Sequence, residues 1–352
     1  MSPIASAADL GDLADPGRHT EPLAIGGTES ALLLDHLRMM VRIRRVEEKI
    51  GDGVAAGKIA CPCHLGIGQE AIAVGVSEHL RASDRVFGGH RSHAHFLALG
   101  GEVYSLLAEI LGRQDGCSHG MGGSMHLYGA AHGFVGSVPI VAGTVPLAAG
   151  AALAAKKDGR GDIAVAYFGD GAIEEGAIHE SMNLAAVWKL PMLFVCENNF
   201  FASHLHISLR QPSDSVGRFA APHRMPVEVV DGNDVVGVSR ATRKLVEGIR
   251  QGAGPAFLEA VTYRWRGHVG PREDNDVGVN RGNDLLLWKA RDPVRRLVDA
   301  MKSAQLLDDA TFRAMDDEER DAVQSAWTQA EMAPYPPAAA LLDRVYAEGG
   351  WP

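Results

Sequence analysis

The sequence is poor in cysteine and has no excess of positive charge. Only four of its 352 residues are cysteines, and they form neither a CxxC pair nor an evenly spaced framework. These cysteines are Cys61, Cys63, Cys117 and Cys196. Reduced thiols in a cytoplasmic protein are the simplest interpretation. The formal net charge of −10 argues against a protein that binds nucleic acid through its phosphates.

The sequence also lacks the segments that carry a chain to or through a membrane. Its first residues contain no basic start followed by an apolar stretch, so we expect no secretory signal. The longest apolar run, residues 140–155, is interrupted by Gly143, Pro146 and Gly150 and is too short to span a bilayer. What remains is a chain with 46% hydrophobic residues, which can bury a large core without crosslinks.

The composition changes near Glu29, where apolar residues begin to recur at helical spacing. Residues 1–28 are small, polar and interrupted by proline and glycine, so we expect a flexible N-terminal arm. We expect one domain over residues 29–345, with a core sheet at about 84–265 and a C-terminal helical arm at about 284–345. The segment 87–138 is rich in glycine and histidine and predicts loops around short helices.

The middle of the chain predicts repeated βα units. Residues 162–168 form an apolar strand, Gly169-Asp170-Gly171 turns the chain, and a helix over 172–188 leads to a strand at 193–196. Further strands at 227–230 and 257–261 flank a helix over 234–250. The pattern predicts an α/β fold with a doubly wound, mostly parallel sheet and helices on both faces.

Polar residues follow two of these strands where parallel sheets bind ligands. Asp170 lies between two glycines at the end of one strand, and the next strand ends in Glu197-Asn198-Asn199. A carboxylate and an amide oxygen suit Mg²⁺, and the helix expected from Ala172 would point its positive end at a phosphate. A Gly-Asp-Gly by itself is more often only a tight turn, so these residues alone support no more than a site for Mg²⁺ and a diphosphate.

The full string GDGAIEEGAIHESMNLAAVWKLPMLFVCENN, residues 169–199, resembles the thiamine diphosphate signature, which opens with GDG and closes with NN. It is most similar to the alpha subunits of 2-oxo acid dehydrogenases (E1 components), which act on pyruvate, branched-chain 2-oxo acids or acetoin. The resemblance implies a thiamine diphosphate-binding fold. It further implies that Asp170, Asn199 and the backbone carbonyl of Phe201 ligate Mg²⁺, with Gly171 and Ala172 against the diphosphate.

Other stretches extend the resemblance to roughly residues 30–345. The segment 86–95 implies that Arg91 holds the diphosphate and that His93 is an active-site histidine. The segment 140–150 implies a backbone contact from Val141 to the aminopyrimidine ring, although Pro139 replaces a glycine common in relatives. The segment 254–268 implies that His268 lies near the diphosphate and assists acyl transfer. Val269 has no hydroxyl, which excludes control by phosphorylation at that position.

The resemblance also implies partners. One cofactor signature is present, so the glutamate that activates the cofactor ring is expected from a beta subunit in an α₂β₂ heterotetramer. The implied reaction is oxidative decarboxylation of a 2-oxo acid, most simply pyruvate, with transfer of the acyl group to lipoamide on an E2 acyltransferase. An acetoin-cleaving dehydrogenase subunit or a thiamine-dependent carboligase would keep the same cofactor site. We expect neither nucleic acid nor a membrane as a partner.

Three other interpretations are less favoured. A nucleotide-binding module would show a GxGxxG fingerprint, which residues 168–176 lack. A subunit that has become only a scaffold would not need the expected metal ligands. A zinc site among the histidines between His79 and His132 is disfavoured, because no HExxH or CxxC accompanies them and Arg91 would repel a divalent cation.

Overall fold

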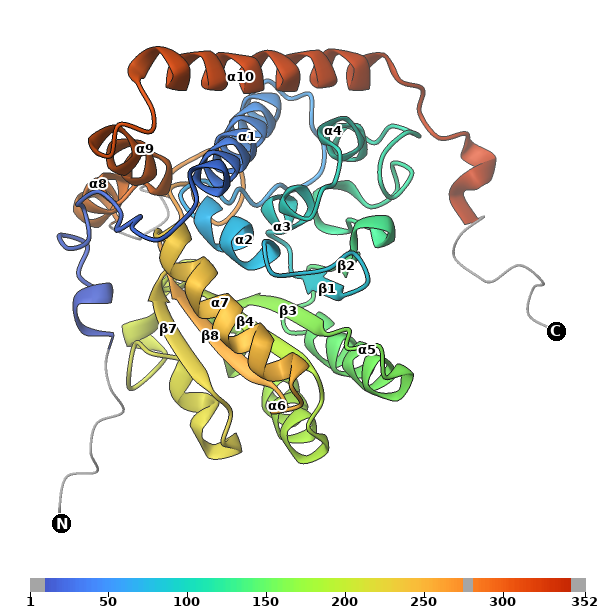
Figure 1. Ribbon diagram of the computed structural model, residues 1–352. Helices are drawn as coiled ribbons and strands as arrows, with labels where there is room; N and C mark the ends of the chain where they lie inside the picture. The colour runs from blue at the N-terminus through green and yellow to red at the C-terminus, as the bar shows by residue number, and fades with distance from the viewer. Residues whose placement is uncertain (1–9, 275–280, 343–352) are drawn as a thin grey trace.

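The computed structural model describes residues 10–274 and 281–342 (Figure 1). Within these residues the centre is a six-stranded parallel sheet with the order β2-β1-β3-β4-β8-β7. Its strands are β1 (Arg85–Gly88), β2 (Phe134–Ser137), β3 (Ala164–Gly169), β4 (Met192–Asn198), β7 (Val227–Asp231) and β8 (Ala256–Val261). A small antiparallel hairpin, β5 (Phe201–Ala202) and β6 (Leu205–His206), follows β4.

Side chains of the central strands alternate between two hydrophobic cores. Val165, Tyr167 and Leu193 join one core, whereas Ala164 and Ala166 join the other. Helices cover both faces because both are apolar and must be buried. On the first face lie α1 (Ser30–Ala55), α2 (Glu70–Ser77), α3 (His93–Ala98), α4 (Val103–Ile110) and α7 (Val235–Arg250), and on the second α5 (Thr144–Asp158) and α6 (Gly176–Trp188). The predicted doubly wound α/β fold is confirmed.

The C-terminal part of the described chain is helical. It contains α8 (Gly282–Ala290), α9 (Pro293–Ser303) and α10 (Asp309–Met332). In Figure 1, α10 lies across α1 and α4. Arg45 of α1 donates two 2.6 Å hydrogen bonds to Asp316 of α10. The helical arm that we expected at about 284–345 therefore packs on the domain, and its last residues, 343–345, lie outside the described chain.

The structure corrects two of the predicted element boundaries. The helix expected over 172–188 begins at Gly176, because a 3₁₀ segment, η4 (Asp170–Glu174), comes first. The positive end of α6 therefore lies one turn farther along the chain than expected. The segment 87–138 contains the end of β1 and all of β2 as well as short helices. Both strands are four residues long and include glycine, so they show no clear alternation of apolar and polar residues.

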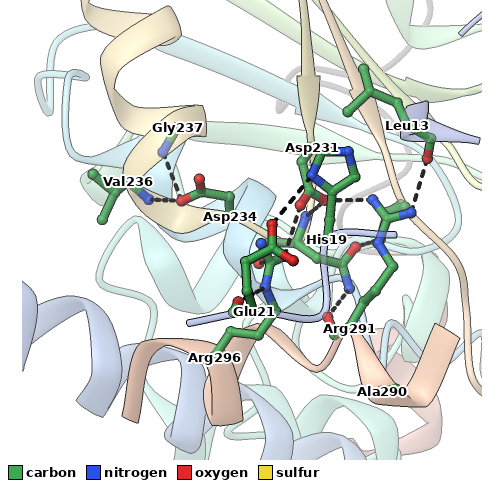
Figure 2. Close-up of polar contacts among 12 residues, drawn as sticks. Leu13, His19, Glu21, Asp231, Asp234, Val236, Gly237, Ala290, Arg291 and Arg296 are labelled. Atoms are coloured by element: carbon green, nitrogen blue, oxygen red, sulfur yellow. Dashed lines mark hydrogen bonds and ion pairs between the residues drawn. The ribbon is translucent and has the colours of Figure 1, made fainter. Parts of the chain in front are cut away.

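Residues 10–28 are held against the domain, which corrects the expectation of a flexible arm for this part; residues 1–9 lie outside the described chain. Arg291 donates a 2.9 Å hydrogen bond to the carbonyl of Leu13, and Arg296 donates one of 3.0 Å to the carbonyl of Glu21 (Figure 2). Both arginines also bind the carboxylate of Asp231 at the end of β7. The arm is thus held by hydrogen bonds from buried arginines to its backbone carbonyls. Because every residue has a backbone carbonyl, the amino-acid composition of the arm does not reveal these contacts.

Candidate active site

A cavity of about 340 Å³ opens at the carboxyl ends of β3 and β4, within the size range of small-molecule sites. β3 and β4 are neighbours in register, with Gly169 opposite Glu197, so the residues after both strands meet at one edge. Most of the predicted site residues line this cavity: Arg91, Val141, Asp170, Gly171, Ala172, Asn199, Phe201 and His268. The fold thus collects side chains from segments more than 170 residues apart.

Asp170 and Asn199 lie together as the sequence predicts. The backbone N–H of Asn199 donates a 3.3 Å hydrogen bond to Oδ1 of Asp170. Gly171 lets η4 approach the hairpin after β4, because a Cβ at this position would lie 2.6 Å from the Cβ of Ala202. This close approach brings the carboxylate of Asp170 beside the backbone amide of Asn199.

Arg210 is a partner of Asp170 that the sequence did not reveal. Its guanidinium donates to Oδ2 of Asp170 and to Glu174, and its side chain is almost fully buried. Burial raises the pKa of Asp170, and the arginine offsets that effect only in part. The signal was absent because Arg210 lies 40 residues away in a loop that no motif includes.

The three residues expected to ligate Mg²⁺, Asp170, Asn199 and Phe201, all line the cavity. The amide oxygen of Asn199 accepts a 3.3 Å hydrogen bond from the backbone N–H of Phe201, and its Nδ2 donates to Gln69. An amide oxygen has two lone pairs, so one stays available for a cation. The turn requires Phe200 in the left-handed region (φ 67°), which directs Phe201 back to the cavity. One carboxylate and neutral oxygens are donors that fit Mg²⁺.

Arg91 is a half-buried cation at the cavity wall. It donates hydrogen bonds to the carbonyls of Leu65 and, at 3.4 Å, of His268. Burial lowers the pKa of Arg91 to about 10, while Glu47 and Glu197 act in the opposite direction. The side chain therefore remains protonated at neutral pH. A guanidinium held in one orientation at a cavity wall is suited to bind a phosphate.

Three histidine rings cluster beside Arg91. The ring of His64 lies 4.5 Å from that of His90 and 4.9 Å from that of His268. Burial first, and then the charge of Arg91, lowers their pKa values to about 3 for His64, about 2 for His90 and about 4 for His268. All three rings are neutral at pH 7. The sequence had identified only His268 as part of the site.

The three rings are the histidine group in the described residues whose nitrogens could share a metal ion. This set differs from the crowded histidines between His79 and His132, of which only His90 belongs to it. The positive charges of Arg91 and Arg264 lower the pKa values of all three rings. The same charges would repel a divalent cation. The electrostatics of this corner favour an anion.

His93 is placed differently from the expectation. Its ring is fully buried, with Nδ1 3.1 Å from Oε2 of Glu47 and Nε2 2.8 Å from the hydroxyl of Ser124. It does not belong to the cavity lining, and both nitrogens already have partners. The helical turn of α3 points His95 to the cavity instead, where its Nε2 lies 3.0 Å from Oε1 of Glu197. The structure therefore corrects the prediction that His93 is an active-site histidine in contact with a substrate, because its ring lies outside the cavity lining.

Comparisons with known proteins agree with this geometry. The family model for the dehydrogenase E1 component matches residues 38–339. The chain belongs to this family. It is therefore a component of a dehydrogenase, an oxidoreductase, as the sequence predicted.

Several relatives match over most of their length. The pyruvate dehydrogenase E1 component subunit alpha of Zymomonas mobilis is 40% identical over 305 residues, which cover 86% of this chain and 85% of the relative. The subunit alpha of the acetoin:2,6-dichlorophenolindophenol oxidoreductase of Bacillus subtilis is 35% identical, with 87% and 91% covered. The human mitochondrial pyruvate dehydrogenase E1 component subunit alpha, somatic form, is also 35% identical, with 89% and 79% covered.

The described part of this E1 component contains no helix with both the length and the apolar character needed to cross a bilayer. The interrupted run at 140–155 forms α5 and the turn before it.

Proposed function

We propose that this chain is the alpha subunit of a 2-oxo acid dehydrogenase E1 component and that its cavity binds thiamine diphosphate with Mg²⁺. The support is that Asp170, Asn199 and Phe201 all line the cavity and are linked by hydrogen bonds. That donor set fits a cation which completes its coordination with phosphate and water. In this proposal Asp170, the amide oxygen of Asn199 and the carbonyl of Phe201 hold the ion.

Arg91, which lines the same cavity, supplies the charge for a diphosphate. Its side chain is fixed by the carbonyls of Leu65 and His268, so little freedom is lost when an anion binds. Gly171 and Ala172 bring backbone close to the same region. When bound, the cofactor supplies a nucleophilic carbon and an electron sink for decarboxylation, and the protein contributes position and electrostatics.

His268 is placed to act on a group beside the diphosphate. It lines the cavity, and its lowered pKa of about 4 leaves the ring neutral at pH 7, with one nitrogen that can donate and one that can accept a hydrogen bond. We propose that it assists transfer of the acyl group to lipoamide. Val141, which is half exposed at the cavity rim, is proposed to contact the aminopyrimidine ring through its backbone.

The reaction that we propose is oxidative decarboxylation of a 2-oxo acid, with pyruvate as the first substrate to test. The names of the relatives from Zymomonas mobilis and from human mitochondria support this choice. Those names also specify an alpha subunit, which supports a beta subunit as the partner in an α₂β₂ assembly and as the source of the activating glutamate. A lipoyl-bearing E2 acyltransferase would receive the acyl group.

A second candidate is cleavage of acetoin. The Bacillus subtilis relative, a subunit of an acetoin oxidoreductase, matches over 91% of its length. Both candidates need the same Mg²⁺ and diphosphate contacts, so the cavity residues described above do not separate them.

The test is co-expression of this chain with its beta subunit and assay of the purified complex. We expect release of CO₂ from pyruvate and reduction of an artificial electron acceptor, both dependent on Mg²⁺ and thiamine diphosphate. Turnover of acetoin without that of 2-oxo acids would select the second candidate. Robust turnover by the pure alpha chain alone would contradict the shared site, and a complex that binds no thiamine diphosphate would contradict the proposal as a whole.

A further inference from the structure

Two thiols lie together just outside the cavity, in the irregular segment 61–65 that we call the CPC strap. Sγ of Cys61 is 4.0 Å from Sγ of Cys63, with Pro62 between the two residues in the chain. Both cysteines are reduced. Cys61 is half buried, Pro62 is exposed and Cys63 is buried. One cysteine is therefore partly exposed, and the second is directly beside it.

The CPC strap connects these thiols to the site. The carbonyl of Cys63 accepts a 2.8 Å hydrogen bond from the N–H of Gly270, and the carbonyl of Leu65 accepts one from Arg91. Between them, His64 packs edge-on against His90 and His268. A change in the backbone at Cys63 would therefore reach both Arg91 and the loop that carries His268.

We propose that Cys61 and Cys63 form a reversible disulfide that acts as an oxidation-sensitive switch on the cavity. The sulfurs would have to approach from 4.0 Å to about 2.0 Å. Cys61 packs against Gly123, whose backbone N–H is fixed by Glu109, so that side of the contact is rigid. Closing the bond would shift the backbone of the strap, where the carbonyl of Cys63 is bound to the N–H of Gly270.

The chemistry balances with a peroxide as oxidant. The thiolate of Cys61 attacks one peroxide oxygen, the O–O bond breaks, the second oxygen leaves as hydroxide, and Cys61 becomes a sulfenic acid. The sulfur of Cys63 then attacks that sulfur and loses its proton, and water leaves. Two thiols give up two electrons, which reduce the peroxide.

The environments of the two thiols suit these different roles. The hydrogen bond with Cys63 lowers the pKa of Cys61 to about 6, although burial opposes this. The same contact, together with burial, raises the pKa of Cys63. Cys61 is thus the thiol with the lower pKa and the one that reacts first.

The first test is a mass measurement that does not depend on the proposed activity. The purified complex is treated with hydrogen peroxide, its free thiols are alkylated, and trypsin releases residues 59–81, which contain both cysteines and no other. We expect this peptide to carry no alkyl group, to be lighter by two hydrogen atoms, and to recover both thiols after a dithiol reductant. Two alkylated thiols, or oxidation of Cys61 to sulfinic acid without a disulfide, would overturn the proposal.

The second test, which rests on the proposed function, measures cofactor affinity before and after oxidation. We expect the oxidised complex to bind thiamine diphosphate on the order of tenfold more weakly, as when a residue that orients a ligand is displaced. The Cys61→Ser complex should keep its affinity after peroxide. The Cys117→Ser complex, the matched control, should lose it as the wild type does. Disulfide formation without any change in affinity, or equal loss in Cys61→Ser, would overturn the link to the cavity.

Discussion

Two aspartates at the carboxyl edge of the same sheet have opposite surroundings. Asp231 ends β7 and binds two buried arginines, Arg291 at 3.0 Å and Arg296 at 2.7 Å (Figure 2). Asp170 follows β3 and has Arg210 as its cationic partner. Burial favours the neutral acid at both positions. The two arginines outweigh it and lower the pKa of Asp231, whereas one arginine does not prevent a raised pKa at Asp170.

The difference separates a structural ion cluster from a binding site. The cluster around Asp231 also holds the N-terminal arm through the carbonyls of Leu13 and Glu21, and its charges are used within the protein. Asp170 faces a cavity and its negative charge is only partly compensated. A buried carboxylate whose charge is only partly compensated is stabilised when a further cation binds beside it. The following changes test this contrast.

Replacing the cavity aspartate should have the largest effect on binding. We expect Asp170→Ala to abolish Mg²⁺-dependent binding of thiamine diphosphate by the complex with the beta subunit, because a charged ligand of the ion is removed. Isothermal titration calorimetry measures this, and Asn199→Ala should show the same loss. Unchanged affinity in either variant would remove that residue from the metal site.

Asp231→Ala should instead damage stability. It leaves two buried guanidinium groups without their carboxylate, which typically costs about 3–5 kcal/mol. Denaturant unfolding of the purified chain measures the free energy of unfolding. The folded fraction of the complex should keep the cofactor affinity of the wild type. A loss of affinity comparable to that of Asp170→Ala would mean that the two aspartates do not have separate roles.

Removing Arg210 should have a moderate effect that depends on Mg²⁺. Without cofactor, Arg210→Ala leaves the buried carboxylate of Asp170 without its cation, and we expect a loss of about 1–3 kcal/mol in the free energy of unfolding. Added Mg²⁺ and thiamine diphosphate should stabilise this variant more than the wild type, since the ion replaces the missing charge. Arg210→Lys, which retains a cation, is the matched control. An equal gain for variant and wild type would show that Arg210 and the ion do not share Asp170.

The pH dependence should be the smallest effect and should have opposite signs. The pKa of Asp231 is lowered from 3.8, so its contribution to stability is complete above that value and is lost as the pH falls through the folded pKa. The pKa of Asp170 is raised, so its contribution is complete below 3.8 and is lost as the pH rises through the folded pKa. Comparing wild type with Asp231→Asn and Asp170→Asn by denaturant unfolding should give slopes of opposite sign, each at most about 1.4 kcal/mol per pH unit. Slopes of the same sign would contradict the contrast.

The central βα units were accessible from the sequence because local pattern decides them. Residues 162–171 combine an apolar run with a glycine turn, and the run before Asn198-Asn199 is equally apolar. Two strands joined by one helix become parallel, and their carboxyl ends then meet at one edge. The proximity of Asp170 and Asn199 follows from that rule together with the observed pairing of β3 and β4.

Contacts between distant segments were not accessible in this way. His93 and His95 are two residues apart in a segment of similar composition, and only the packing of α3 sends one to Glu47 and the other to the cavity. Arg210 joins Asp170 from a loop outside every recognised motif. The strands β1 and β2 are too short to show periodicity, so the sheet itself decides their conformation.

By itself, the sequence determined that this protein builds a parallel α/β sheet and presents an acid and an amide after two of its strands, since apolar runs and glycine turns act over a few residues. Only the tertiary structure decided which charges compensate which. It gave Asp231 two arginines and Asp170 one, collected His64, His90 and His268 beside Arg91, and placed Cys61 next to Cys63 on the strap behind them. The physical reason is that buried charges are balanced by whichever groups the packing brings within a few ångströms, and these groups come from any part of the chain.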